Sequence, residues 1–152
     1  MRSDFIVGLH IMGFLTAANG RSLSSKVLAE TYGTNPVVVR RILGKLSEAG
    51  LVKSQRGAGG GTILADEPAR INLRDIYEAV TESGGVLPRY PMSEGGPSEV
   101  LGGYVNHLLE AAEDDLLTRL SEISISEMDR RVRPAICSIL ETAVGQRESE
   151  SS

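Results

Sequence analysis

The strongest structural pattern in this chain lies in residues 24–64, SSKVLAETYGTNPVVVRRILGKLSEAGLVKSQRGAGGGTIL. Ser24 or Ser25 can cap a first helix, because a serine hydroxyl accepts a hydrogen bond from an unpaired N–H of the first turn. Asn35 suits the cap of a second helix, and Pro36 suits its first position, where an N–H would have no partner. The pattern predicts two short helices joined by a tight turn.

The second helix should bury one side and expose the other. Its apolar residues recur at the spacing of a buried helical stripe. They are Val39, Ile42, Leu43 and Leu46. The basic residues Arg40, Arg41 and Lys45 fall largely outside this stripe, so we expect them to face outward. Gly50 is placed to end the helix in a left-handed conformation.

A hairpin is expected next. Residues 51–55 have the length of a strand, residues 62–64 return, and RGAGGG at residues 56–61 forms the tip. Two helices with a tight turn, followed by a basic, glycine-rich hairpin, suit the grooves of duplex DNA. The predicted fold is therefore mostly α, with a winged helix-turn-helix domain and a two-stranded wing.

The charge of this segment differs in sign from that of the whole chain. Residues 20–64 contain seven cationic and two anionic side chains, which gives +5. The whole chain has a formal net charge of −4, so the other residues together carry −9. A local basic region attracts phosphate even when the overall pI, about 5.2, is acidic. The sequence therefore predicts double-stranded DNA as a partner.

Four motifs carry a resemblance to a known family. They are SSKVLAE, NPVVVRRILGKLSEAGLV, SQRGAGGGTILA and RINLRDIYEAV. In these motifs the chain resembles the Rrf-type bacterial transcription regulators, the family of IscR and NsrR, closely over residues 1–82 and more loosely beyond. The resemblance implies a winged helix-turn-helix homodimer that binds a palindromic operator, usually as a repressor. It also implies a possible [2Fe-2S] cluster, held by three cysteines before a long dimer helix.

The segment that would hold such a cluster lacks the required ligands. Residues 84–107, GGVLPRYPMSEGGPSEVLGGYVNH, contain no cysteine, and the single cysteine of the chain, Cys137, lies far downstream. Iron–sulfur clusters are normally held by cysteine thiolates. We therefore expect no cluster, no other metal and no cofactor, and we interpret His107 as at most a relic ligand position.

The family pattern also implies which residues contact DNA. We expect the start of the second helix to meet base edges, the start of the first helix and Lys45 to meet phosphates, and the tip to enter a minor groove. For the tip glycines, the alternative is a merely flexible hairpin. The expected DNA-binding residues are Ser24, Ser25, Lys26, Asn35, Pro36, Val37, Arg40, Arg41, Lys45, Arg56, Gly57 and Gly59.

The N-terminal residues superficially resemble a signal peptide. Asp4 and His10 interrupt the apolar run, which is too short to span a bilayer. Apolar residues recur there at helical spacing. They are Phe5, Leu9, Met12 and Leu15. We expect a first helix in which His10 is an ordinary, partly covered residue, a further short helix capped by Asn72, no membrane association and a reducing, cytoplasmic location.

A loop should separate the winged domain, residues 1–82, from the C-terminal helices. Residues 83–97 contain glycine and proline at a density that no regular element tolerates. Two interpretations stay open. Arg89, Tyr90 and Met92 line a pocket for a small-molecule effector, or the segment is a plain flexible linker, which we favour.

Residues 98–145 are expected to form the dimerisation helices. A broad apolar stripe extends from Val100 to Leu120, opposite an acidic side that we expect to face solvent. The acidic residues are Glu110, Glu113, Asp114 and Asp115. An apolar helix of this length on a small domain favours a partner helix, and a symmetric dimer matches two DNA half-sites about 34–36 Å apart. The alternative is an internal core helix.

A final helix is expected after a break near residues 124–127, with Ser126 as its cap and Pro134 at its start or in a kink. It contains Cys137, which is either a buried structural thiol or a redox sensor. Residues 146–152 are polar and are expected to be disordered.

An enzyme is not expected. GAGGG is not followed by a Lys-Ser/Thr pair and does not open a helix, as a nucleotide-binding loop would. Two distant histidines and one cysteine offer no nucleophile, base and orienting group. The sequence predicts a sequence-specific transcriptional regulator, expected to be a homodimeric repressor. In the alternative, oxidation of Cys137 or a protein partner controls it, rather than a small-molecule ligand.

Overall fold

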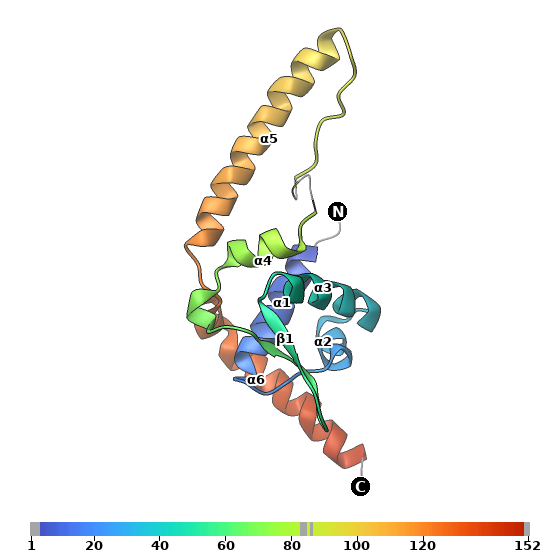
Figure 1. The fold of residues 1–152 in the computed structure, drawn as a ribbon, viewed down its shortest axis with the longest axis vertical. Helices are drawn as coiled ribbons and strands as arrows, with labels where there is room; N and C mark the ends of the chain where they lie inside the picture. The colour runs from blue at the N-terminus through green and yellow to red at the C-terminus, as the bar shows by residue number, and fades with distance from the viewer. Residues whose placement is uncertain (1–3, 83–84, 86, 151–152) are drawn as a thin grey trace.

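Two long helices extend in opposite directions from a central unit of shorter helices and a hairpin (Figure 1). The computed structural model describes residues 4–82, 85 and 87–150. In chain order its elements are α1 (Asp4–Ala17), α2 (Ser25–Tyr32), α3 (Pro36–Glu48), β1 (Val52–Gln55), β2 (Gly61–Leu64), the 3-10 helix η1 (Pro68–Arg70), α4 (Leu73–Val80), α5 (Pro97–Ser121) and α6 (Ile125–Glu150). The fold is mostly helical, which confirms the predicted class.

Capping residues set the ends of the two helices in the helix-turn-helix. Ser24 caps α2, because its hydroxyl accepts a hydrogen bond from the N–H of Val27 at 3.2 Å. Asn35 caps α3 in the same way, through the N–H of Val37 at 2.8 Å. Between them, Gly33 has a φ of 78°, a conformation that glycine adopts without steric cost. The tight turn that the sequence predicts is therefore confirmed.

The wing is an antiparallel hairpin that is joined to the segment before α2. Strands β1 and β2 pair with Gln55 opposite Gly61, so Gly61 belongs to the returning strand and not to the tip. An isolated bridge pairs Thr62 with Leu23. A Cβ atom on Gly61 would lie 2.5 Å from the Leu23 carbonyl oxygen, which explains the need for glycine there.

The core surrounds α1, which packs against α2, α3, α4, α6 and β2. The largest fully buried side chains come from most of these elements. They are Ile11, Met12, Leu28, Val39, Ile42, Leu46, Ile71, Ile76, Val80 and Ile125. Helix α1 is covered on more than one side, since Val7, Ile11 and Phe14 are buried while Phe5 and Leu9 of the expected stripe are only partly buried. A single stripe therefore underestimates the burial of this helix.

Helix α4 closes the winged unit through a capping box. The N–H of Asp75 donates to the Asn72 side chain at 3.0 Å, and the N–H of Asn72 donates to the Asp75 carboxylate at 2.9 Å. The predicted Asn72 cap is confirmed. The buried residues of α4 are Leu73, Ile76, Tyr77 and Val80.

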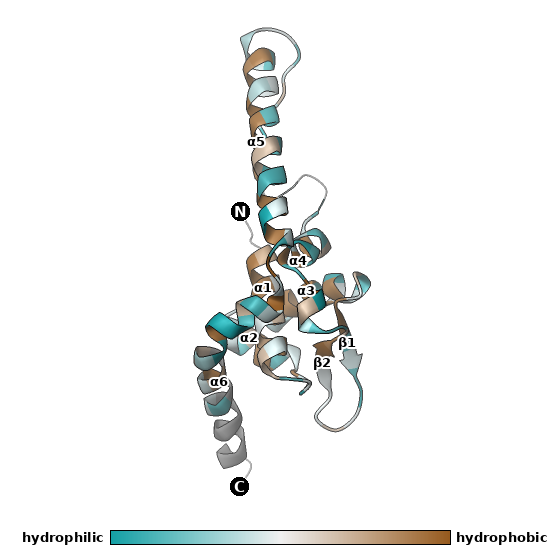
Figure 2. Ribbon diagram, turned by 90° about the vertical axis from the view of Figure 1, so that its left-hand side faces the viewer, coloured by the Kyte–Doolittle hydropathy of each residue, from teal (hydrophilic) through white to brown (hydrophobic). Residues whose placement is uncertain are grey.

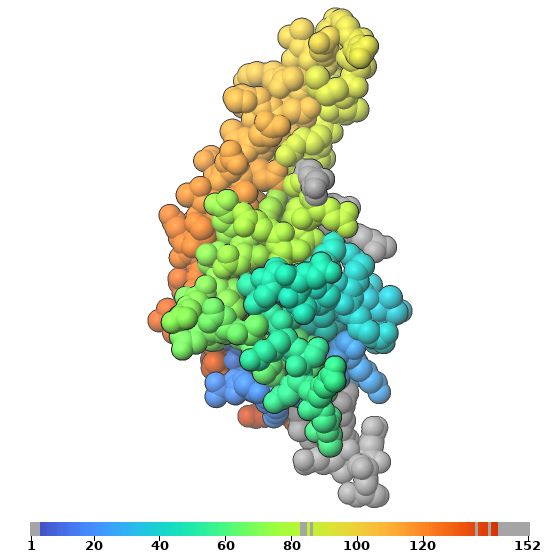
Figure 3. Space-filling model, viewed as in Figure 1, coloured from blue at the N-terminus to red at the C-terminus, as the bar shows by residue number. Residues whose placement is uncertain are grey.

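Helix α5 forms an arm that projects from the winged unit, together with the segment before it (Figure 3). Apolar residues recur along this arm (Figure 2). Several of them are exposed, with Val100 at 76% and Tyr104 at 63% of their full accessible area. The other exposed large apolar residues of α5 are Leu101, Leu108 and Leu116. The alternative of an internal core helix does not describe this part of α5.

Helix α6 differs from the expectation at both ends. It begins directly after Ser124, whose hydroxyl accepts a first-turn N–H, so Ser126 is not the cap. Pro134 lies inside the helix. The backbone stays helical to Glu150, where the sequence predicts disorder over residues 146–152, because glutamine, arginine and glutamate are good helix formers. The last two residues lie outside the described part.

Candidate nucleic-acid interface

A groove of about 460 Å³ lies between the start of α2, one side of α3 and the wing strands. Its polar lining comes from all three elements. These residues are Ser24, Ser25, Arg40, Ser47, Lys53, Ser54 and Thr62. Arg40 and Lys53 give the groove positive charge, and serine and threonine hydroxyls donate hydrogen bonds. This combination suits a phosphate backbone.

One side of α3 is open next to this groove. Val37, Arg40, Gly44 and Ser47 follow each other at three- and four-residue intervals, so they share one face of the helix. Val37 is 62% exposed, and space is open around Gly44, where an added Cβ would meet nothing within 4 Å. The Arg40 Nε atom lies 3.4 Å from the Ser25 hydroxyl on α2. The face is therefore accessible to a large partner.

The start of α2 combines a capped helix end with exposed polar groups. The Ser24 hydroxyl is occupied as the cap, whereas Ser25 and Lys26 remain on the surface. The Lys26 ammonium lies 4.0 Å from Glu30, with both side chains more than half exposed. Such an exposed pair holds a lysine only weakly. Lys26 is thus available to an external anion.

The wing tip is a hydrogen-bonded turn with exposed side chains. Gly57 and Gly59 have φ values of 118° and 74°, which favour glycine. The N–H of Gly60 donates to the Gly57 carbonyl at 2.9 Å, and the Ser22 hydroxyl donates to the Gly59 carbonyl at 2.8 Å. These bonds hold the tip in a turn, on which Arg56 is exposed.

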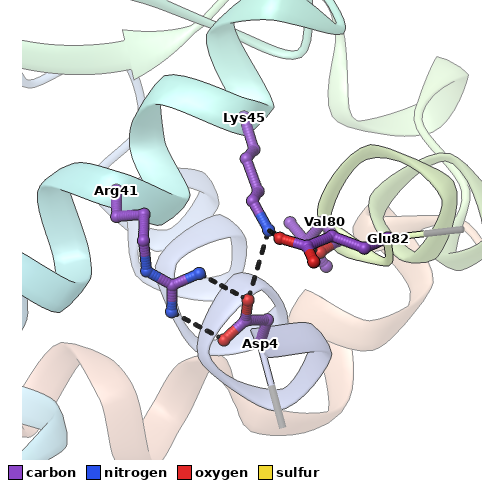
Figure 4. A network of polar contacts seen from close by, with 5 residues as sticks. All are labelled: Asp4, Arg41, Lys45, Val80 and Glu82. Carbon is purple, nitrogen blue, oxygen red and sulfur yellow. Dashed lines mark hydrogen bonds and ion pairs between the residues drawn. The ribbon is translucent and has the colours of Figure 1, made fainter. Parts of the chain in front are cut away.

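Two of the cations expected at the interface point elsewhere (Figure 4). The Arg41 guanidinium donates to both Asp4 carboxylate oxygens, at 2.7 and 2.8 Å. The Lys45 ammonium lies 3.3 Å from Asp4, 3.2 Å from the Val80 carbonyl and 3.2 Å from Glu82. All three basic residues of α3 lie outside its buried stripe, and Arg41 remains 39% exposed, but α1 and the end of α4 offer acceptors to Arg41 and Lys45.

The electrostatics of this contact are consistent with its geometry. The hydrogen bonds and the positive charge of Arg41 lower the pKa of the Asp4 carboxyl below its ordinary value, against the effect of partial burial. In turn, the carboxylate raises the pKa of Arg41. Both groups therefore stay ionised at neutral pH.

Glu113 of α5 is buried, against the expectation of a solvent-facing acidic side. The residue is 7% exposed, and its carboxylate accepts hydrogen bonds from the Tyr77 hydroxyl of α4 and from Arg89 at 2.6 Å. The hydrogen bond to Glu113 raises the pKa of Arg89. Helical periodicity could not indicate this burial, because the covering residues come from other parts of the chain.

The three residues considered for an effector pocket separate into two places. Arg89 lines an open cleft of about 400 Å³ between α4 and α5. Tyr90 and Met92 instead lie against Gly102 of α5, where an added Cβ would be 2.7 Å from the Tyr90 ring and 3.0 Å from the Met92 sulfur. The Tyr90 backbone also exchanges two hydrogen bonds with the Asn106 side chain, at 2.7 and 3.2 Å. Tyr90 and Met92 thus lie against α5.

The residues present do not fit an iron–sulfur cluster. The 152-residue sequence contains one cysteine, and a cluster requires several thiolates. Cys137 is partly buried on α6, and His107 is exposed on α5. Within the described residues, no group of three or more histidine, cysteine, aspartate or glutamate side chains is placed to hold a metal ion.

His10 has a structural role in the helical unit. Its Nε2 atom lies 3.0 Å from the Thr31 hydroxyl, and its ring packs against Phe14 and Tyr32. Burial lowers the pKa of this histidine. His10 therefore belongs to the contact between α1 and α2.

Comparison with known proteins places this geometry in a family. The sequence matches Rrf2, described as an iron-dependent transcriptional regulator, over residues 1–131. The chain belongs to the Rrf2 family. It is therefore a DNA-binding transcriptional regulator, and its family consists of regulators rather than enzymes. Among the helices of the described residues, none has the length and apolar character needed to cross a membrane.

Relatives and solved structures agree with this assignment. The chain is 35% identical to the putative HTH-type regulator YwnA of Bacillus subtilis over 80 residues, 53% of this chain and 58% of YwnA. It is 33% identical to the regulator CymR of B. subtilis over 93 residues, 60% of this chain and 66% of CymR. The structure of T. potens IscR superimposes with a TM-score of 0.67 at 26% identity, covering 89% of both chains.

Proposed function

We propose that this Rrf2-family protein is a homodimeric repressor that binds a palindromic operator. The observation that carries the proposal is the open groove between α2, α3 and the wing, which Arg40 and Lys53 make positive. The exposed face of α3 borders this groove and has the size and accessibility that entry into a major groove requires.

The contacts divide by what each part of the interface presents. Val37 and Arg40, exposed on α3, are assigned to base edges, because arginine pairs with guanine and an apolar side chain meets a thymine methyl group. Ser25 and Lys26 at the start of α2 are assigned to phosphate, where the helix dipole also favours an anion. The wing tip with Arg56 is assigned to a minor groove.

Three of the residues expected at the DNA interface set where α2 and α3 begin. Ser24 and Asn35 use their side-chain oxygens as helix caps, and Pro36 starts α3. The Asn35 side chain keeps its amide hydrogens for a base or phosphate. Arg41 and Lys45 are not assigned to DNA, because both donate hydrogen bonds to the Asp4 carboxylate.

Dimerisation is assigned to α5. Its exposed apolar side chains would be costly in water, and a second copy of the same helix covers them symmetrically. Two winged units then face one side of DNA, which accounts for a palindromic operator. The dimer acts without an iron–sulfur cluster, because the chain lacks the thiolates for one.

Selection of binding sites tests this proposal. The purified protein is incubated with a pool of random duplexes, and the bound DNA is sequenced after several rounds. We expect enrichment of an inverted repeat with half-sites one helical turn apart or a multiple of it, bound with strong salt dependence. Placed over a promoter in a bacterial reporter strain, the selected site should lower transcription when the protein is present. Salt-insensitive retention or the absence of an enriched repeat would contradict the proposal.

A further inference from the structure

Asp4 contacts both cations of α3 that point away from the groove. Arg41 forms a two-pronged contact with its carboxylate, the geometry that fits a guanidinium to a carboxylate best (Figure 4). Lys45 has three ammonium hydrogens and faces three acceptors, Asp4, the Val80 carbonyl and Glu82, at 3.2–3.3 Å. The donors of Lys45 are thus matched within the protein.

The network removes positive charge from the edge of the interface. Arg41 and Lys45 lie one turn apart on α3, and Arg41 is next to Arg40 in the sequence. Neither Arg41 nor Lys45 is among the described residues that line the groove, whereas Arg40 is. With Asp4 and Glu82, the four charged side chains of the network have no formal net charge. The Arg41 side chain is still 39% exposed, so losing Asp4 would free it for an external anion.

We propose that Asp4 is a specificity-determining residue, which holds Arg41 and Lys45 on the α1 side of α3 and so keeps two cations from DNA phosphates. This inference rests on the proposed function. Phosphate contacts strengthen binding to every sequence, whereas base contacts strengthen binding to the operator. Withholding two phosphate contacts therefore lowers the affinity for random DNA. It raises the ratio of the affinity for the operator to the affinity for random DNA.

The salt dependence of binding to random DNA tests this role. The affinity of the full-length protein for a fluorescent 30-base-pair duplex of random sequence is measured by anisotropy at several salt concentrations. Asp4→Asn should bind this duplex more tightly, and the slope of log affinity against log salt should steepen by about 0.9 for each cation released, up to about 1.8 per subunit and so up to about 3.6 for the proposed dimer. Adding Arg41→Gln and Lys45→Gln to Asp4→Asn should return the slope to that of the wild type.

A charge-matched control separates the contact from net charge. Glu78→Gln also removes one negative charge, but Glu78 pairs with Arg74 on α4, at 2.7 Å. The salt slope of Glu78→Gln should equal that of the wild type. Equal slopes for Asp4→Asn and Glu78→Gln would overturn the inference.

A second comparison leaves Asp4 in place, so it also decides the question if Asp4→Asn fails to fold. Arg41→Gln and Arg74→Gln each remove one cation that is paired with a carboxylate. If Asp4 withholds Arg41, both variants have the same slope on the random duplex. A slope that is shallower by about 0.9 per subunit for Arg41→Gln alone shows that Arg41 already contacts phosphate, which overturns the inference. Failure of the proposed function looks different, because the wild type itself then shows no salt-dependent binding.

Discussion

Arg40 and Arg41 are adjacent in the sequence but have different surroundings. Arg40 lies in the groove beside Ser25, and Arg41 is bound to Asp4. The sequence alone places both on the polar side of α3, because the helical pattern distinguishes only buried from exposed positions. The partner that separates them, Asp4, lies 37 residues earlier in the chain. Local patterns contain no information on such distant contacts, so this part of the site could not be predicted.

The roles of single cations can be separated by alanine substitutions. Arg40→Ala should lose about 1–3 kcal/mol on a selected operator and much less on random DNA, as expected for a base contact. Lys26→Ala should weaken binding to both DNAs by similar factors. Anisotropy titrations on the two duplexes measure these effects. An equal loss on both duplexes for Arg40→Ala would assign that residue to phosphate.

The ion pair of Asp4 also predicts a pH dependence of stability. Pairing with Arg41 lowers the pKa of this carboxyl in the folded state below its ordinary value of 3.8. The contribution of the carboxylate is therefore present above pH 3.8 and is lost as the pH falls through the lower, folded-state value. In thermal melting, the wild type should have a higher Tm than Asp4→Asn. This difference in Tm should be constant near neutrality and disappear under acid conditions. A gap that persists at the lowest pH would exclude this origin.

The helices and strands show which sequence patterns are reliable. Helices α2 and α3 were predictable because Asn35, Pro36 and Gly33 mark their ends through local chemistry. Helix α1 was only partly predictable, since neighbours on several sides bury residues outside one stripe. The burial of Glu113 on α5 depends on Tyr77 and Arg89, which lie far away in the sequence.

The contact between the wing and the segment before α2 predicts that alanine substitutions at two glycines change stability in opposite directions. Gly61→Ala should lower the free energy of unfolding by about 1–3 kcal/mol, because the new Cβ would overlap the Leu23 backbone. Gly44→Ala is the matched control. It lies in a helix with open space, so it should raise stability by about 0.5–1 kcal/mol. Urea unfolding measures both, and a Gly61→Ala protein as stable as the wild type would contradict the close contact.

Across the whole molecule, the proposed DNA-binding face and the proposed dimer helix are separate. Helix α5 projects away from the winged unit, and its exposed apolar residues lie far from the groove along the chain (Figures 1 and 2). The sequence predicted this long apolar helix from the helical spacing of its apolar residues. It could not predict which side of α5 the chain itself covers, because residues such as Tyr90 reach Gly102 from the preceding segment.

This separation predicts that dimerisation and DNA contact can be lost independently. Leu108→Asp places a carboxylate on the exposed apolar side of α5, where a dimer would have to desolvate it without a partner. We expect the dimer dissociation constant to rise at least about tenfold in sedimentation measurements. Val37→Asp should leave the dimer intact while abolishing operator binding. A monomeric Val37→Asp protein, or an unchanged dimer with Leu108→Asp, would contradict the assignment of α5.

The bridge between Leu23 and Thr62 has a consequence for the thermodynamics of recognition. It joins the hairpin to the residues that lead into α2, so the wing proposed for a minor groove and the helix end proposed for phosphate are held at a fixed separation in the free protein. The conformational entropy of placing the hairpin is therefore lost during folding and not during association. Complex formation should accordingly resemble the docking of a preorganised body, with fast capture and little loop ordering.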